Sequence, residues 1–167
     1  MPNISFDAAD IRILRELQDA GRITNQQLAE KVGMAASPCW RRVRQLEQQG
    51  VIAGYRAVLD RKKVGLGILA FIRIKIDSHN ATEARQFEVE IETLPAVIAC
   101  YAVAGSADFL LQVVSRDLDE YSEFAMTVLR ALPRIKEMET TFVLREIKPL
   151  GAMPLIGTSL SVAPLGK

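Results

Sequence analysis

Histidine is nearly absent from this chain, and cysteine is scarce. The 167 residues include one histidine, His79, and two cysteines, Cys39 and Cys100, which lie far apart and form no CxxC pair. Zinc sites and disulfide frameworks need several such residues at characteristic spacings. The sequence therefore predicts no metal site and no disulfide, which is typical of a reducing cytoplasm.

Long apolar runs and secretion signals are missing as well. No apolar run reaches the roughly 18 to 20 residues that a membrane-spanning helix needs. The N-terminus does not place a basic segment before an apolar one, as a secretory signal does. Hydrophobic residues still make up 49% of the chain, enough for a core. We expect a cytoplasmic protein of one or two small domains, with no membrane partner.

Residue combinations typical of enzymes are also lacking. The sequence shows no Ser–His or Cys–His pairing signal and no phosphate-binding loop. His79 lies in the polar segment 77–80, where a solvated loop residue is the simpler interpretation. We therefore expect no catalytic residues and no enzyme, with an enzyme built on the second half of the chain as a third, least favoured class.

Charge is unevenly distributed along the chain. Residues 1–63 carry 11 Lys and Arg against 7 Asp and Glu, a net charge of +4. Residues 64–167 carry 10 against 13, a net charge of −3. This asymmetry is expected if only the first part meets a polyanion such as DNA. Chance asymmetry in a neutral protein is the alternative.

Two helix starts in the first 60 residues carry complete capping signals. Asp7 with Asp10, and Thr24 with Gln27, match the N-cap and N3 positions of capping boxes. Gly33 can end the second helix because glycine adopts positive φ without a steric penalty. The sequence thus predicts two short helices before a third.

The third predicted helix begins near Ala36 or Ser37 and combines an apolar stripe with a cluster of arginines. Cys39, Val43 and Leu46 recur at i, i+4 and i+7 and face inward. The β-prone residues 51–59 that follow are compatible with a two-stranded wing. We therefore interpret residues 23–42 as the helix-turn-helix of a winged DNA-binding module.

The N-terminal part of such a helix reaches base edges in the major groove. Arginine is the best reader of guanine, because its forked donors match O6 and N7. We expect Ser37, Arg41 and Arg44 to read bases and Arg42 to contact phosphate. For Trp40, a core or edge aromatic and a base contact are equally open. The candidate DNA-binding residues are Thr24, Asn25, Ser37, Pro38, Trp40, Arg41, Arg42 and Arg44.

Beyond a charged, glycine-containing segment, the pattern changes to alternating strands and helices. The apolar face of one strand, opposite its helix-covered face, would carry Leu69 and Phe71 and so favours an interface between two copies. The β-α-β-β-α-β order predicts an α+β fold class with a ferredoxin-like antiparallel sheet. Strands are expected at 68–76, 97–103, 109–114 and 136–144, and helices at 81–93 and 118–132.

Three groups of residues carry a specific resemblance to a known family. They are 7–11 with 13–18 and 21–25, then 37–43 with 46–47 and 50–52, and finally the GSADFLL segment at 105–111. Over about residues 4 to 149 the chain resembles the Lrp/AsnC, or feast/famine, transcriptional regulators of bacteria and archaea. The resemblance implies double-stranded DNA as a partner, a C-terminal domain that senses amino acids, and dimers that often form tetramers or octamers.

The resemblance also implies an effector site at the GxxD turn, at the junction between dimers. An amino-acid ligand needs an acceptor for its ammonium group, which Asp108 can supply, and amide donors for its carboxylate, which a glycine turn exposes. A plain tight hairpin turn is the alternative interpretation. The candidate effector-binding residues are Gly105, Ser106, Ala107, Asp108, Thr140 and Thr141.

Two positions depart from the family pattern. The family often has serine where this chain has Ala35, so either Ser37 caps the third helix or its cap is weaker. It often has a smaller apolar residue where this chain has Trp40.

The predicted domains are a winged helix-turn-helix DNA-binding domain (1–60), a linker (61–67), a ferredoxin-like effector-binding and oligomerisation domain (68–149) and a C-terminal tail (150–167). The predicted function is a sequence-specific transcriptional regulator whose assembly or DNA affinity responds to a small amino acid, with leucine and methionine as first candidates and no other cofactor. An architectural DNA-wrapping protein with little effector response is the alternative.

Overall fold

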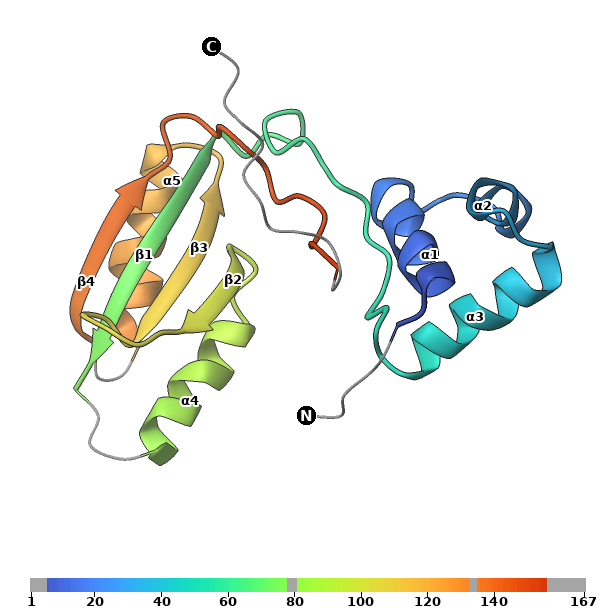
Figure 1. Cartoon of the computed structure of the whole chain (residues 1–167). Helices are drawn as coiled ribbons and strands as arrows, with labels where there is room; N and C mark the ends of the chain where they lie inside the picture. Colours follow the sequence, from blue (N-terminus) through green and yellow to red (C-terminus); the bar gives the residue numbers. More distant parts are fainter. Residues whose placement is uncertain (1–5, 78–80, 133–134, 156–167) are drawn as a thin grey trace, which may run out of the picture. The chain divides into compact units, whose positions relative to one another are not determined.

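The computed structural model describes residues 6–77, 81–132 and 135–155. They form two compact units, whose helices and strands are labelled in Figure 1. The first unit takes its described residues from Met1–Val58 and Lys148–Lys167, and the second is Leu59–Ile147. The first unit is therefore assembled from two separate parts of the sequence.

Three helices build the first unit: α1 (Ala8–Asp19), α2 (Asn25–Val32) and α3 (Ala36–Gln48) (Figure 1). Each contributes an apolar stripe to one shared core, which agrees with the predicted helical periodicity. The buried members of this core are Ile13, Leu14, Leu28, Ala29, Val32, Cys39 and Leu46.

Both predicted capping boxes are confirmed. The Asp7 carboxylate accepts hydrogen bonds from the backbone N–H groups of Ala9 and Asp10, at 2.8 and 2.9 Å. The Thr24 hydroxyl accepts from the N–H of Gln27 at 3.2 Å, and the Gln27 side chain accepts from the N–H of Thr24 at 3.1 Å. Local sequence thus determines where α1 and α2 begin.

The start of α3 differs from its expected form. Its N-cap residue is Ala35, which offers no side-chain hydrogen bond, and Ser37 lies inside the first turn. Of the two possibilities that the sequence left open, a cap from Ser37 is wrong, because a capping side chain must stand outside the helix it caps, and the weaker cap is confirmed. The first-turn amides of α3 therefore receive no side-chain cap.

The segment after α3 also differs from expectation. Among the described residues, 51–58 form no hydrogen-bonded strand pair, so the two-stranded wing is not formed as a paired ribbon. Val51 and Ile52 pack against the core of the first unit, whereas Val58 is 97% exposed. The segment is anchored at its start and extended at its end.

Residues 61–67, predicted as a linker, are held within the second unit, which begins at Leu59. The Arg61 guanidinium donates to the carbonyls of Leu66 and Gly67, at 2.5 and 2.6 Å. The Gly67 N–H donates to the Arg116 carbonyl at 3.1 Å. A Cβ at Gly67 would lie 2.5 Å from that same oxygen, so only glycine fits this close approach.

Part of the predicted tail returns to the first unit. Gln18 of α1 donates from Nε2 to the Met153 carbonyl at 3.2 Å and accepts at Oε1 from the Met153 N–H at 2.6 Å. Leu155 packs against the core of the first unit. The residues of the tail from 156 onward lie outside the described part of the chain, as do His79 and Pro133.

The second unit is a four-stranded antiparallel sheet in the order β2-β3-β1-β4 (Figure 1). This order and the βαββαβ succession confirm the predicted ferredoxin-like α+β fold. The elements are β1 (Ile68–Ile76), α4 (Ala81–Glu92), β2 (Val97–Ala102), β3 (Phe109–Ser115), α5 (Leu118–Glu123) and β4 (Ile135–Phe142).

The helix predicted over 118–132 changes its winding along its length. After α5 the chain forms a π-helical turn at Phe124–Val128 and a 3-10 turn at Leu129–Ala131. Tyr121, Ala125 and Leu129 remain buried against the sheet. The apolar spacing therefore predicted the buried side chains but not the hydrogen-bond pattern.

Strict alternation along β1 separates the two faces of the sheet. Ala70, Ile72 and Ile74 are fully buried in the core beneath the helices. On the other face Leu69 is 6% exposed, Phe71 is half-buried, and Arg73 pairs with Glu139 at 2.6 Å. This face carries more charge than the sequence pattern alone suggested.

Candidate functional site

The first turns of α2 and α3 lie next to one another on the first unit. Asn25 Nδ2 donates to the Ala36 carbonyl at 3.0 Å, which joins the start of α2 to the start of α3. Thr24 and Ser37 are exposed beside this contact, and Pro38 is half-buried. Backbone amides at two adjacent helix starts can both face an anionic backbone.

The three arginines of α3 have different surroundings. Arg41 is exposed. Arg42 forms ion pairs with Asp7 at 2.7 Å and with Asp10 at 2.8 Å, across the N-terminus of α1. These two carboxylates raise the pKa of Arg42. Hydrogen bonding from the Asp10 amide, followed by that from Arg42, lowers the pKa of Asp7. Arg42 therefore fastens α3 to α1, and its phosphate contact stays a prediction.

Arg44 is held by neighbours on the surface of α3. Its Cζ lies 5.5 Å from the centroid of the Trp40 ring, and its Nη1 donates to Glu47 Oε2 at 3.3 Å. The Tyr55 hydroxyl donates to the other oxygen of Glu47 at 3.2 Å. Burial, followed by the bond to Glu47, raises the pKa of Tyr55, so this hydroxyl keeps its proton near neutral pH. Trp40 is 54% exposed, which excludes the core interpretation.

The structure thus brings Ser37, Trp40, Arg41 and Arg44 together on one exposed side of α3. It also adds Glu47 and Tyr55, which the sequence reasoning missed. The i, i+3 spacing of Arg44 and Glu47 was a signal that could have identified the first of them. Tyr55 lies beyond the helix, and its position depends on the path of the chain after α3.

The GxxD turn between β2 and β3 is tied closely to β1. Asp108 donates its N–H to the Ile74 carbonyl at 2.9 Å and accepts at Oδ2 from the Ile76 N–H at 2.8 Å. Gly105 has a φ of 141°, which L side chains rarely adopt. Ser106 is exposed and Ala107 is buried. The turn is a tight hairpin, and one carboxylate oxygen of Asp108 serves that hairpin.

Thr140 and Thr141 point to opposite faces of β4. The hydroxyls of Thr140 and Tyr121 share a hydrogen bond on the helix-covered side of the sheet. Thr141 is exposed and pairs in register with Phe71, on the other side. Within one chain the structure therefore brings the turn residues together but does not bring both threonines to the turn.

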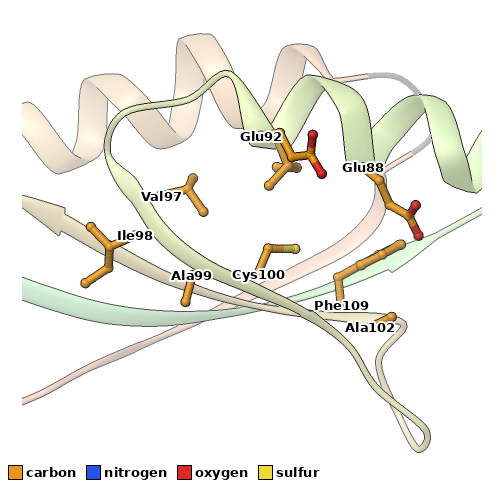
Figure 2. A pocket seen from close by; sticks show the side chains of 9 residues that line it. Glu88, Glu92, Val97, Ile98, Ala99, Cys100, Ala102 and Phe109 are labelled. Carbon is orange, nitrogen blue, oxygen red and sulfur yellow. The ribbon is translucent and has the colours of Figure 1, made fainter. Parts of the chain in front are cut away.

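A hollow of about 370 Å³ lies between α4 and β2. Figure 2 shows Glu88 and Glu92 projecting from α4 above Cys100 and Phe109. Burial, followed by the charge of Glu88, raises the pKa of the Cys100 thiol, which disfavours the thiolate that metal binding requires. Within the described residues no group of three or more His, Cys, Asp or Glu side chains could hold a metal ion. Likewise, none of the helices in the described ranges is long and apolar enough to cross a membrane.

Comparison with known proteins covers both units. Residues 6–53 match a family described as winged helix-turn-helix DNA-binding, and residues 69–153 match the Lrp/AsnC ligand binding domain. A leucine-responsive regulatory protein from Rhizobium meliloti is 40% identical over 145 residues, which cover 87% of this chain and 93% of that protein.

Solved structures of transcriptional regulators are also similar to this chain. A transcriptional regulator from Neisseria meningitidis, in complex with L-Met, has a TM-score of 0.87 and 37% identity, and the match covers 92% of this chain and 99% of that one. An AsnC family transcriptional regulator from Agrobacterium tumefaciens has a TM-score of 0.84 and 32% identity, with 89% and 97% covered.

Proposed function

The chain belongs to the Lrp/AsnC family, and on that premise we propose how its two units act as a DNA-binding transcriptional regulator that responds to an amino acid. The first unit binds duplex DNA, and the second binds the effector. We further propose which residues contact DNA and effector, how the chain assembles and where in the cell it acts.

The exposed face of α3 supports the assignment of DNA reading. Arg41 and Arg44 reach base edges, and Ser37 with the uncapped first turn of α3 meets a phosphate. Thr24, Asn25 and Pro38 line the adjacent helix starts, and Trp40 and Arg42 complete the site. Selection from a pool of randomised duplexes tests this function directly. Retention without enrichment of any motif would leave only non-specific binding.

The carboxylate of Asp108 supports effector binding at the turn. Its carboxylate accepts one hydrogen bond from Ile76 and has a second oxygen that an ammonium group can use. One relative is called leucine-responsive and another was solved in complex with L-Met, so leucine and methionine are our first candidates for the effector. A thermal-shift screen of twenty amino acids at millimolar concentration tests the proposal. If DNA binding holds and none of them raises Tm, the architectural alternative takes its place.

The face of the sheet opposite the helices supports dimerisation. Leu69 and Phe71 lie on it, with Tyr101 about half exposed on β2. A two-fold dimer would present two copies of α3 about one DNA turn or a multiple apart. Further assembly to tetramers or octamers would bring turns of neighbouring dimers together, where Thr140 and Thr141 of different copies can contribute. Light scattering of the purified protein measures this assembly.

Two further proposals follow from the family. The relatives are transcriptional regulators, and we propose that the chain catalyses no reaction. A regulator of this kind acts where the chromosome is, so we propose the cytoplasm as its location.

A further inference from the structure

Four side chains on the DNA-binding unit form an unbroken line of contacts. Trp40 lies under the Arg44 guanidinium, Arg44 donates to Glu47, and Glu47 accepts from Tyr55. Trp40 and Arg44 are one helical turn apart, and Glu47 lies three residues further along the same side of α3. Tyr55 comes from the segment that follows the helix, so the line connects α3 to the chain behind it.

An exposed arginine without such neighbours would sample many rotamers. Ordering a long charged side chain on binding costs affinity, and a side chain already held near its bound orientation avoids part of that cost. Reading guanine requires the guanidinium fork to approach O6 and N7 in one orientation. The ring of Trp40 restricts the plane of the fork, and Glu47 restricts the direction of one of its edges.

The hold on Arg44 is weak enough for DNA to displace part of it. The side chains of Arg44 and Glu47 are 59% and 29% exposed, and an exposed pair of this kind contributes little stability. The carboxylate is itself held by the Tyr55 hydroxyl, which donates to Glu47 Oε1 at 3.2 Å. Glu47 therefore competes with phosphate for Arg44 and stays in position while doing so.

We propose that Trp40, Glu47 and Tyr55 are positioning residues that set the sequence specificity of Arg44. Trp40 acts through Arg44 and does not touch a base. Glu47 withholds Arg44 from phosphates at non-specific sites, where no guanine edge repays the loss of the ion pair. This inference rests on the proposed reading of DNA by α3 and names the residues that adjust it.

The first experiment measures base preference by selecting from a pool of randomised duplexes and sequencing the bound fraction. Arg44→Ala identifies the position that Arg44 reads. We expect Trp40→Ala and Glu47→Gln to reduce preference at that same position about threefold to fivefold, and Tyr55→Phe about twofold. Trp40→Phe should retain most of the preference, since phenylalanine still offers a ring face.

The second experiment measures the salt dependence of binding to one duplex that lacks the selected motif. Freeing Arg44 for a phosphate adds one contact, so Glu47→Gln should steepen the slope of log K against log salt by about 0.9. General damage to the fold would weaken binding without steepening this slope. Glu120→Gln is the matched control, because it removes the same charge from an exposed Arg116–Glu120 pair in the second unit.

Trp40 is the only tryptophan, so its fluorescence reports on the same contacts without DNA. Arg44→Ala and Glu47→Gln should both increase quenching of Trp40 by acrylamide, and Glu120→Gln should not. Thermal denaturation of each variant shows whether the first unit is still folded, and the conservative Trp40→Phe and Tyr55→Phe keep the test informative if Trp40→Ala unfolds.

Three results of these experiments would contradict the proposed positioning roles. If Trp40→Ala changes preference at a different position from Arg44→Ala, Trp40 contacts a base itself and the inference is overturned. Unchanged preference and unchanged salt slope in Glu47→Gln overturn it as well. If the wild type enriches no motif, base reading by α3 fails first, and the positioning roles fail with it.

Discussion

The DNA-facing side of α3 and the GxxD turn are both exposed and polar, but they use their polar groups differently. On α3 the side chains of Arg41 and Arg44 are exposed, and the first-turn amides of the helix have no side-chain cap. At the turn, the N–H and one carboxylate oxygen of Asp108 bond to β1, and its carbonyl accepts from the Val103 N–H to close the hairpin. A polyanion can bind an exposed convex face, whereas a small ligand must be enclosed to be bound tightly. If both proposed sites are correct, one chain is enough to present α3 to DNA, whereas enclosing a ligand at the turn requires a second copy.

The largest expected effect comes from destabilising one unit and measuring whether the unfolding transition of the other unit changes. Ile72 is fully buried in the second unit, so Ile72→Ala should lower its free energy of unfolding by about 2–5 kcal/mol. Calorimetry should show one transition shifted down and the transition of the first unit in place. A single transition that moves as a whole would mean that the two units unfold as one.

Two substitutions at Asp108 separate its structural role from its proposed role in binding. Asp108→Asn keeps an acceptor for the Ile76 N–H and loses the charge, whereas Asp108→Ala loses both. Both should abolish ligand-induced stabilisation, which is about 2.7 kcal/mol at a ligand concentration of 100 Kd. Only Asp108→Ala should lower the melting temperature without ligand.

Binding of duplex DNA by the two Asp108 variants is the control, and it should survive in the absence of ligand. Persistence of the full thermal shift in Asp108→Asn would argue that the charge of Asp108 does not bind the effector.

On the DNA side, Arg44 and Arg42 form a matched pair of arginines with different partners. Arg44→Ala should cost about 1–3 kcal/mol of specific binding and relax preference at one base position. Arg42→Ala should chiefly lower the stability of the first unit, because it leaves Asp7 and Asp10 without their cation. Gel-shift titrations beside thermal melts measure both effects. Equal loss of sequence preference in the two variants would contradict this division.

The smallest expected effect is a pH dependence of the first unit. The pKa of Asp7 is lowered in the folded chain, so its contribution to stability is present above its unfolded pKa, about 3.9, and is lost as pH falls through the lower folded value. Acid titration of unfolding should show this loss in the wild type and a flatter curve in Asp7→Asn. If stability falls with pH equally in the wild type and in Asp7→Asn, Asp7 does not cause the acid sensitivity of the first unit.

Short-range features of the fold could be predicted from the sequence, because their causes are local. The capping boxes at Asp7 and Thr24 involve residues three positions apart, and the alternation in β1 follows from strand geometry. The fold class followed from the order of these elements.

Features that depend on distant partners could not be predicted. Arg42 lies outside the apolar stripe, which suggested a phosphate contact, and its ion pairs with Asp7 and Asp10 at the start of α1 were not foreseen. The π-helical turn at Phe124–Val128 and the path of residues 51–58 depend in the same way on packing that periodicity does not encode. Likewise, Thr140 and Thr141 point to opposite faces of β4, and the proposed sharing of an effector site with the turn residues would depend on a second copy.

The two hydrogen bonds between Gln18 and Met153 affect when the first unit can complete its fold during translation. Protein chains emerge from the ribosome N-terminus first, and domains generally fold as they emerge. Helices α1, α2 and α3 can therefore assemble early, but the side-chain amide of Gln18 can bond Met153 only after the whole second unit, which ends at Ile147, has been translated. Chains released early by premature termination would carry the DNA-binding helices without this closing contact. Proteolysis of nascent chains stalled before and after Met153 would reveal when the first unit becomes complete.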